Sequence, residues 1–234
     1  MTLSLRSLLT GLLGCASVLC IAQERLRPAT RQELWASFAV QGGAPNVLYD
    51  LLGNVRAERL RFGAELGYRS ADVFFAGKQV YLDMNARYKF SDLLSVGVEH
   101  RVASRSTGSI QQRSIVQAML RKEFGRFKAD YRFIYQHSYI EWGDQREVFR
   151  NRFDLAYNIK GWKLDPEFGV EFFSWLGNKG FSYFGTRYHF GTEVSLGKGH
   201  ALGLNLIHDR ERDVAYPTHR WIWSVGYTMN LRKT

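Results

Sequence analysis

A strict alternation of apolar and polar residues, repeated in segments of similar length, most constrains what this chain can fold into. In residues 59–69 one set of alternate positions holds Leu60, Phe62, Ala64, Leu66 and Tyr68, and the other set holds Arg61, Gly63, Glu65, Gly67 and Arg69. Because successive side chains of a strand point to opposite faces, such a segment has one apolar face and one charged face. The pattern predicts an all-β protein.

The same alternation predicts a closed antiparallel transmembrane β-barrel of about twelve strands. The expected strands are residues 33–41, 46–57, 60–69, 78–90, 93–104, 112–122, 126–138, 147–159, 163–173, 183–196, 200–209 and 219–231. Ten strands is the alternative, because Gly42, Gly43 and Pro45 interrupt the least regular stretch, residues 33–57. Short periplasmic turns alternating with longer external loops would make the strand number even and place both termini in the periplasm.

Segment length and aromatic content favour a membrane barrel over a soluble one. Soluble strands usually have about 5 or 6 residues, whereas a tilted strand needs about 9 to 11 to cross a bilayer. The chain has 12 Tyr, 16 Phe and 6 Trp, and aromatic girdles mark membrane interfaces. A soluble sandwich or lipocalin-like barrel, with its apolar face inward, is the alternative. The expected interfacial aromatic residues are Tyr68, Tyr88, Phe90, Trp142, Trp162, Trp175, Trp221, Trp223 and Tyr227.

The first residues have the pattern of an export signal. Arg6 precedes an apolar run, and small residues before Gln23 predict a signal peptide over residues 1–22. Residues 23–32 would then be a periplasmic N-terminal segment, 33–231 the barrel and 232–234 a C-terminal tail. These features predict the outer membrane of a Gram-negative cell. Two alternatives are lipidation at Cys15 and a single membrane anchor, although the apolar run is short for a spanning helix.

The charged face predicts a polar lumen. The formal net charge is +10, but the basic residues occur singly among acids, which argues against a nucleic-acid-binding patch. We expect a lumen largely filled by a salt-bridge network, with a narrow anion-preferring channel as the alternative. The network would contain Arg61, Glu65, Arg69, Asp83, Arg87, Glu99, Arg101, Arg113, Asp130, Arg132, Arg150, Arg152, Asp154, Glu171, Arg187, His189, Glu193 and Arg220.

Catalytic and metal-binding patterns are weak in this sequence. His137 and Ser138 are adjacent, so on a strand they would face opposite ways and could not act as a base and its nucleophile. Residues 208–213 are expected to form a solvated external loop near lipopolysaccharide rather than a metal site. We therefore predict no catalytic residue, no metal and no cofactor, with a lipid-modifying outer-membrane enzyme as a further alternative.

Several Arg-aromatic strand segments resemble the uncharacterised bacterial family called domain of unknown function 2490. The segments are residues 87–90, 96–101 and 149–153, and the resemblance covers about residues 31–231. Members of that family, frequent in Bacteroidetes, are short exported proteins with outer-membrane barrel patterns. The resemblance implies a fold and a location, with the bilayer, lipopolysaccharide and the barrel-insertion machinery as partners. It supplies no activity, and this chain departs from common practice by ending without a terminal aromatic residue.

Overall fold

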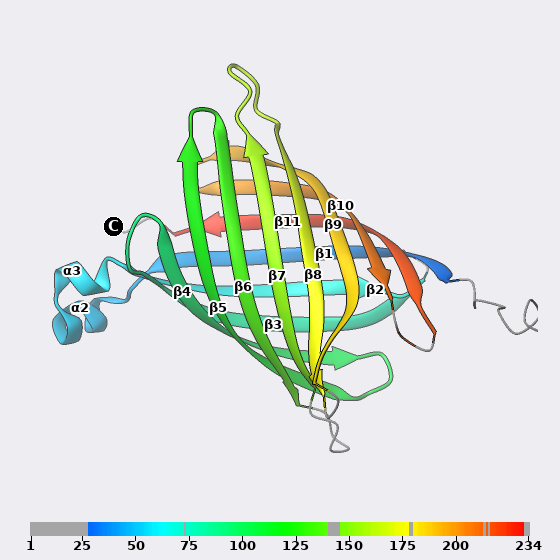
Figure 1. Ribbon diagram of the computed structural model, residues 1–234. Helices are drawn as coiled ribbons and strands as arrows, with labels where there is room; N and C mark the ends of the chain where they lie inside the picture. Colours follow the sequence, from blue (N-terminus) through cyan, green and yellow to red (C-terminus); the bar gives the residue numbers. More distant parts are fainter. Residues whose placement is uncertain are drawn as a thin grey trace, which may run out of the picture.

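The computed structural model describes residues 28–72, 74–139, 146–177, 180–212, 214 and 216–231. Within these residues the chain forms a closed barrel of eleven strands, which confirms the predicted all-β barrel (Figure 1). The predicted signal peptide, the start of the predicted periplasmic segment, Trp142 and the C-terminal tail lie outside the described residues.

Two short helices interrupt the series of strands after the first one. The elements in chain order are β1 (Ala29–Gly43), α2 (Asn46–Leu52), α3 (Asn54–Ala57), β2 (Leu60–Ser70), β3 (Gly77–Lys89), β4 (Leu94–Arg105), β5 (Ile110–Phe124), β6 (Phe127–Tyr139), β7 (Arg146–Tyr157), β8 (Asp165–Gly177), β9 (Gly180–Gly197), β10 (His200–Glu211) and β11 (Thr218–Asn230).

The barrel closes through a parallel pair, which corrects the prediction of an even, fully antiparallel barrel. Consecutive strands pair antiparallel, but β1 runs parallel to β11, with Ala29 opposite Thr218 and Gln41 opposite Asn230. Both strands therefore start at one end of the barrel, here called the N-terminal mouth, and finish at the other, the C-terminal mouth. Because the strand number is odd, the first strand begins at one mouth, at Ala29, and the last strand ends at the other, at Asn230, whereas the prediction put both ends on the periplasmic side (Figure 1).

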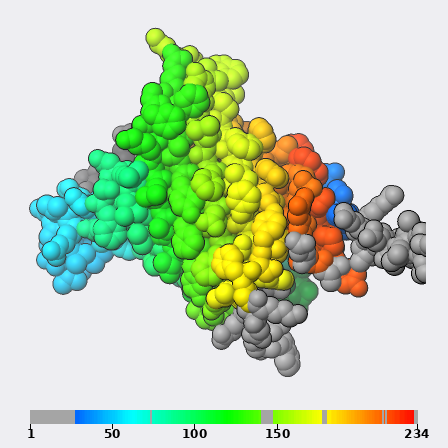
Figure 2. All heavy atoms as spheres, in the orientation of Figure 1, coloured from blue at the N-terminus to red at the C-terminus, as the bar shows by residue number. Residues whose placement is uncertain are grey.

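The expected strand at residues 46–57 is wrong: this segment forms α2 and α3. Val47, Leu51 and Val55 recur every fourth residue, a helical spacing rather than a strand spacing. Gly53, with a φ of 78°, separates the two helices; a positive φ is readily adopted only by glycine. The helices project from the C-terminal mouth, as the cyan segment shows in Figures 1 and 2.

The connections do not alternate in length as the sequence suggested. The expected long loop at residues 174–182 is largely strand, because β8 continues to Gly177 and β9 begins at Gly180. The longest connection instead joins β1 to β2 at the C-terminal mouth and contains both helices. Loop length alone therefore predicted neither the strand number nor the positions of the termini.

The barrel wall has an apolar outer face and a polar inner face. On β3, Val80, Leu82 and Met84 are exposed, whereas Tyr81 and Asp83 between them are 6% and 5% exposed. The soluble alternative required the opposite arrangement. Closure leaves no unpaired strand edge, which is the part of a sheet that otherwise invites pairing with another chain. None of the helices that the structure describes is long and apolar enough to cross a membrane.

Candidate functional site

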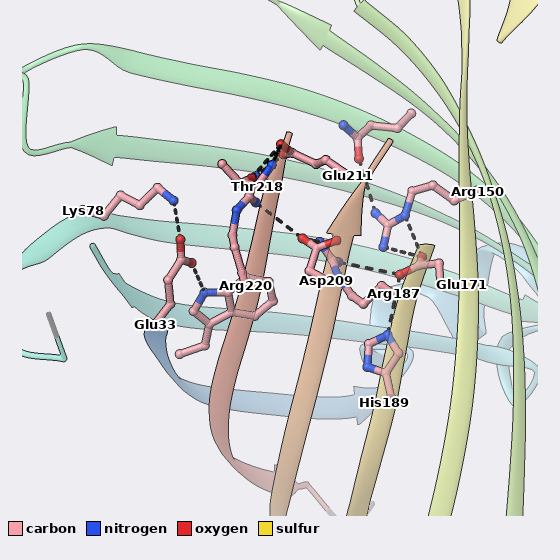
Figure 3. Close-up of polar contacts among 12 residues, drawn as sticks. Glu33, Lys78, Arg150, Glu171, Arg187, His189, Asp209, Glu211, Thr218 and Arg220 are labelled. Carbon is pink, nitrogen blue, oxygen red and sulfur yellow. Dashed lines mark hydrogen bonds and ion pairs between the residues drawn. The ribbon is translucent and has the colours of Figure 1, made fainter. Parts of the chain in front are cut away.

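One side of the lumen carries a row of charges that alternates in sign from strand to strand. Arg220 on β11, Asp209 on β10, Arg187 on β9, Glu171 on β8 and Arg152 on β7 are successive register partners. Opposite charges on directly paired positions stabilise neighbouring strands. Figure 3 shows most of this row, here called the charge ladder, crossing the barrel wall.

Close contacts join four members of the charge ladder, from Arg220 to Glu171. The Nη2 atom of Arg187 donates to Oδ2 of Asp209 at 2.9 Å, and Nη1 of Arg220 lies 3.4 Å from the same oxygen. Glu171 is fully buried, and its Oε1 accepts a 2.7 Å hydrogen bond from Nε of Arg150. Arg187 approaches its other oxygen at 3.6 Å. A carboxylate buried this deeply is stable only because cations surround it.

The opposite wall combines ion pairs with arginine–aromatic stacking. Nε of Arg101 on β4 donates to Oδ1 of Asp83 on β3 at 2.5 Å, and its second nitrogen contacts the other carboxylate oxygen. The same guanidinium lies over the Tyr81 ring, 3.7 Å from its centroid. Tyr81 donates its hydroxyl hydrogen to Glu65 at 2.7 Å. Stacking and bidentate pairing together fix the plane of the Arg101 side chain.

The Tyr81 ring occupies space that a glycine leaves open. Gly67 on β2 is the register partner of Tyr81, and a Cβ atom at Gly67 would overlap the phenol ring. A glycine within a strand often marks a close approach of this kind. Gly67 thus allows the aromatic ring to lie flat across the lumen wall, beneath Arg101.

A cavity of about 630 Å³ lies between these two walls, towards the N-terminal mouth. Three glutamates, Glu65, Glu99 and Glu171, contribute to its lining. Eight arginines also line it: Arg69, Arg101, Arg105, Arg113, Arg132, Arg150, Arg152 and Arg187. The space enclosed by the barrel is therefore strongly basic.

Several of these arginines have donors without an acceptor. The buried Nε atoms of Arg69, Arg113 and Arg132 make no hydrogen bond to any described residue. Arg69 and Arg132 also have no carboxylate within ion-pair distance among the described residues, although Arg69 stacks on Trp35, 3.9 Å from the ring centroid. A buried N–H group without a partner is costly, so such groups are normally satisfied by water or an anion.

A second cavity, of about 820 Å³, lies at the C-terminal mouth beside α3. It is also basic, with lining cations Arg59, Arg61, Arg87, Lys89 and Arg121 and lining acids Glu58 and Asp92. At its rim, Nζ of Lys89 donates a 2.6 Å hydrogen bond to Asp92, which lowers the pKa of that exposed carboxyl. Positive side chains thus line both cavities of the barrel.

The structure places the predicted network residues as follows. Asp83, Arg101, Asp154, Glu171 and His189 are buried, and Arg61 and Glu193 are exposed. The half-buried members are Glu65, Arg69, Arg87, Glu99, Arg113, Asp130, Arg132, Arg150, Arg152, Arg187 and Arg220. Asp130 pairs with Arg121 at 2.7 Å, and Arg152 pairs with Asp154 at 2.8 Å.

The predicted interfacial aromatic residues that the structure describes fall into two groups. Tyr68, Trp175 and Trp221 lie in the halves of their strands nearer the N-terminal mouth, with Trp223 further along β11. Tyr88, Phe90, Trp162 and Tyr227 lie nearer the C-terminal mouth. Phe90, Trp162, Trp221 and Trp223 are exposed.

The expected external loop at residues 208–213 needs correction. Residues 208–211 belong to β10, and Asp209 is 6% exposed inside the lumen. Sequence reasoning also missed Trp35, Phe173 and the fully buried Glu33, which accepts a hydrogen bond from Lys78 at 2.8 Å. The strand period of two could have identified them as inward-facing residues. Asp209 and Glu33 lie an even number of positions from inward residues of their own strands, and such residues share one face.

His189, expected in the lumen network, and His137, expected to face away from Ser138, occupy two different environments. His189 is buried in the lumen, with Nε2 3.7 Å from Glu171. Ser138 faces the lumen and accepts a hydrogen bond from Gln136, whereas its neighbour His137 approaches Glu147 on the outer face. Among the described residues, no group of His, Cys, Asp and Glu could hold a metal ion.

A protein-family model described as "Protein of unknown function (DUF2490)" matches residues 34–220. The chain belongs to the DUF2490 family. The matched range covers nearly the whole DUF2490 barrel, from early β1 to the start of β11. A solved structure titled "Bacterial polysaccharide outer membrane secretin" is similar at 10% identity with a TM-score of 0.47, covering 72% of this chain. The DUF2490 chain spans 62% of that structure's length. A search of curated proteins found no match.

Proposed function

We propose that this protein is an outer-membrane β-barrel, exported by the signal segment at residues 1–22, whose lumen is a narrow anion-preferring pore. The observation that carries the pore is the arginine excess around the cavity of about 630 Å³, where buried N–H groups have no acceptor among the described residues. Rings of Arg and Lys favour anions in pores.

The membrane location is supported by the side of the wall on which the apolar residues lie. Leu66, Val98 and Phe190 are 54%, 53% and 61% exposed on the outer face. In water, an apolar surface around a whole barrel would drive aggregation, whereas in a bilayer it meets acyl chains. Closure fits this environment, because lipid cannot hydrogen-bond to a free strand edge.

The two cavities support a route along the lumen. Arg61, Arg87, Gly97, Gln117 and Ile134 follow one another as register partners from β2 to β6. Arg61 and Arg87 line the cavity at the C-terminal mouth, and Gln117 and Ile134 line the other one. An anion moving along this wall would meet Arg61 and Arg87 at the C-terminal mouth and then Gly97, which has no side chain, before it reached Gln117 in the other cavity.

The pore is tested by single-channel recording of the purified full-length chain in planar bilayers. With a KCl gradient, the reversal potential should show preference for chloride over potassium. Arg132→Gln should reduce that preference, because Arg132 lines the cavity and has no carboxylate partner. The matched control, Arg31→Gln, changes a mouth residue in an exposed pair with Asp72. Absence of steady conductance, or preference for potassium, would overturn the pore.

We propose that the C-terminal mouth, with α2 and α3, faces the periplasm, because three of its connections, residues 90–93, 125–126 and 198–199, are short turns of the kind found on the periplasmic side of outer-membrane barrels. The only two cysteines are Cys15 and Cys20, so a cysteine introduced in the barrel would be its single thiol. In intact cells, a membrane-impermeant maleimide should label Thr107→Cys in the β4–β5 connection and leave Ser91→Cys in the β3–β4 turn unlabelled. Labelling of Ser91→Cys but not of Thr107→Cys in intact cells would show that the barrel has the opposite orientation. If neither cysteine were labelled in intact or in lysed cells, neither connection would be exposed to solvent, against the proposed barrel.

A further inference from the structure

Four polar side chains form one row across the outer face of β4 to β7. His100 on β4, Ser114 on β5, His137 on β6 and Glu147 on β7 are successive register partners. The residues before and after them on their strands, such as Arg101, Arg113 and Val148, line the lumen, so the four face outward.

Hydrogen bonds converge on the Ser114 hydroxyl. Its Oγ lies 3.0 Å from Nδ1 of His100 and 3.2 Å from the hydroxyl oxygen of Tyr139. On the neighbouring side, Nδ1 of His137 lies 3.9 Å from Oε1 of Glu147. The His137 ring meets the Tyr139 ring edge-on, with centroids 4.6 Å apart. The cluster thus joins a hydroxyl, two imidazoles, a phenol and a carboxylate.

These groups match the parts of a serine hydrolase. A serine becomes a nucleophile when a base lies within hydrogen-bond reach, and 3.0 Å is within that reach. With the proton of His100 on Nε2, its Nδ1 accepts the Ser114 hydrogen. The Tyr139 hydroxyl, 3.2 Å from Oγ, can donate to the oxygen that becomes negative during acyl transfer. The His137 ring, which approaches Glu147, packs edge-on against the tyrosine ring and so limits its movement.

The place of the cluster on the barrel indicates the substrate. Towards the C-terminal mouth, the outer face of β4 and β5 is apolar, with Val98, Val116 and Leu120 exposed. Towards the N-terminal mouth, both strands end within a few residues of the cluster, at Arg105 and Ile110. Beyond the cluster, the outward positions of these strands are the mixed set Val102, Ser104, Ile110 and Gln112, so the cluster lies near the N-terminal edge of the apolar band. In a bilayer, this depth is the boundary between acyl chains and headgroups, where the ester carbonyls of lipids lie.

We propose that Ser114, His100 and Tyr139 form a hydrolase site for acyl esters of membrane lipids, with His137 as a positioning residue. Ser114 Oγ attacks the ester carbonyl carbon, and His100 takes the hydroxyl proton. The bond to the lipid alkoxide breaks as His100 returns that proton to it, which leaves an acyl-serine. Water then attacks the acyl-serine, gives a proton to Ser114 through His100 and releases the fatty acid. The substrate class rests on the proposed membrane location, but the nucleophile does not.

The first experiment tests the nucleophile without a membrane. The full-length protein in detergent is treated with a fluorophosphonate probe, and the modified residue is identified by peptide mass spectrometry. Labelling is expected at Ser114, to be lost in Ser114→Ala and strongly reduced in His100→Gln. Ser104→Ala and His208→Gln are the matched controls, because both change outward-facing residues outside the cluster. Folding of every variant is checked by heat-modifiable migration in gels. Folded protein that is not labelled at Ser114 would overturn the site.

The second experiment tests the substrate and distinguishes two sources of the ester. Fatty-acid release is measured by mass spectrometry from phosphatidylethanolamine vesicles and, separately, from vesicles containing lipopolysaccharide. Release from at least one is expected, and it should fall about 10²- to 10⁴-fold in His100→Gln. Labelled Ser114 without release from either lipid would overturn the lipid-ester substrate while leaving the nucleophile in place.

The positioning role of His137 predicts a specific kinetic pattern. His137→Gln should lower kcat with little change in KM, because it loosens Tyr139 rather than substrate binding. Tyr139→Phe should lower kcat similarly, and the double variant should lose little more than either single one, since the residues act as a unit. If the losses in kcat of the two single variants added up in the double variant, or if His137→Gln raised KM alone, His137 would not act by positioning Tyr139.

Discussion

The guanidinium of Arg69 lies flat over the indole of Trp35, 3.9 Å from the ring centroid, and forms no ion pair among the described residues. Arg101 and Arg187 bring further positive charge towards it. A half-buried cation in this position is held by an aromatic face and by packing rather than by a counter-ion. Its charge is therefore free to act on an anion in the lumen.

Arg69→Gln should change selectivity more than stability. The lost cation–π contact is worth about 0.5–2 kcal/mol, and removing one charge from a cluster of arginines relieves repulsion. We expect the free energy of unfolding in urea to change by about 1 kcal/mol or less, while chloride preference in bilayer recordings falls. A large loss of stability would mean that Arg69 has a structural counter-ion role.

Glu171→Gln should lower the stability of the barrel more than it changes its anion selectivity. Glu171 is fully buried against Arg150 and Arg187, and removing one partner of a buried ion pair typically costs about 3–5 kcal/mol. The unfolding midpoint of the variant in urea should fall accordingly. Asp72→Asn, in the exposed pair with Arg31, is the control and should cost about 1 kcal/mol or less. If Glu171→Gln and Asp72→Asn lowered the free energy of unfolding equally, the charge ladder would be exposed to water rather than buried.

Gly67→Ala should destabilise the barrel because the new methyl group would overlap the Tyr81 ring. Overpacking of this kind costs about 1–3 kcal/mol, and displacement of Tyr81 would also remove its contacts with Glu65 and Arg101. Gly203→Ala is the control, because a Cβ there meets its nearest atom at an ordinary 3.7 Å. Urea unfolding of both variants checks the contrast, which would be absent if the Tyr81 ring lay elsewhere.

Val98→Arg tests which solvent meets the outer face. Val98 is 53% exposed on β4, and an arginine facing lipid near the bilayer midplane costs about 2–4 kcal/mol. The cost should appear as a lower unfolding free energy in phospholipid vesicles. Val55→Arg on α3, which is 69% exposed but outside the barrel, should have little effect. An unfolding free energy unchanged by Val98→Arg would indicate that this surface meets water.

Asp92 provides a test at the rim of the C-terminal cavity. Its pKa is lowered from 3.8, first by the hydrogen bond from Lys89 and then by the lysine charge. A lowered pKa in the folded state means that the interaction stabilises the fold above the unfolded pKa and is lost as pH falls through the folded value. A ¹³C titration of the carboxyl should give a midpoint below 3.8, and Lys89→Gln should raise it. An unchanged midpoint would show that the contact is absent in solution.

The faces of the strands could be predicted from the sequence because a side-chain period of two is a local property. Val80 and Asp83 follow that rule, and their exposure differs as expected. Residues 46–57 could have been assigned correctly, since the apolar positions Val47, Leu51 and Val55 recur every fourth residue. The strand predicted there followed from the regular series of strands around it and not from this helical spacing.

Contacts between strands could not be predicted, because they depend on register and on which strands meet at closure. Ser114 and His100 lie on the two strands of one hairpin, and only the register of that hairpin makes them direct partners in the sheet. The parallel contact of β1 with β11 joins the two ends of the chain, and no local pattern distinguishes it from an antiparallel closure. The site on the outer face depends on the first of these relationships.

The parallel seam also limits how the polypeptide can be rearranged. In an even-stranded barrel the ends meet at one rim, and a short linker could join them for circular permutation. Here Ala29 and Asn230 are separated by the full length of the seam, roughly 40 Å for an extended strand. A peptide fused before Ala29 and another fused after Asn230 would consequently emerge in different compartments, so one molecule could carry two tags that never share the same solution.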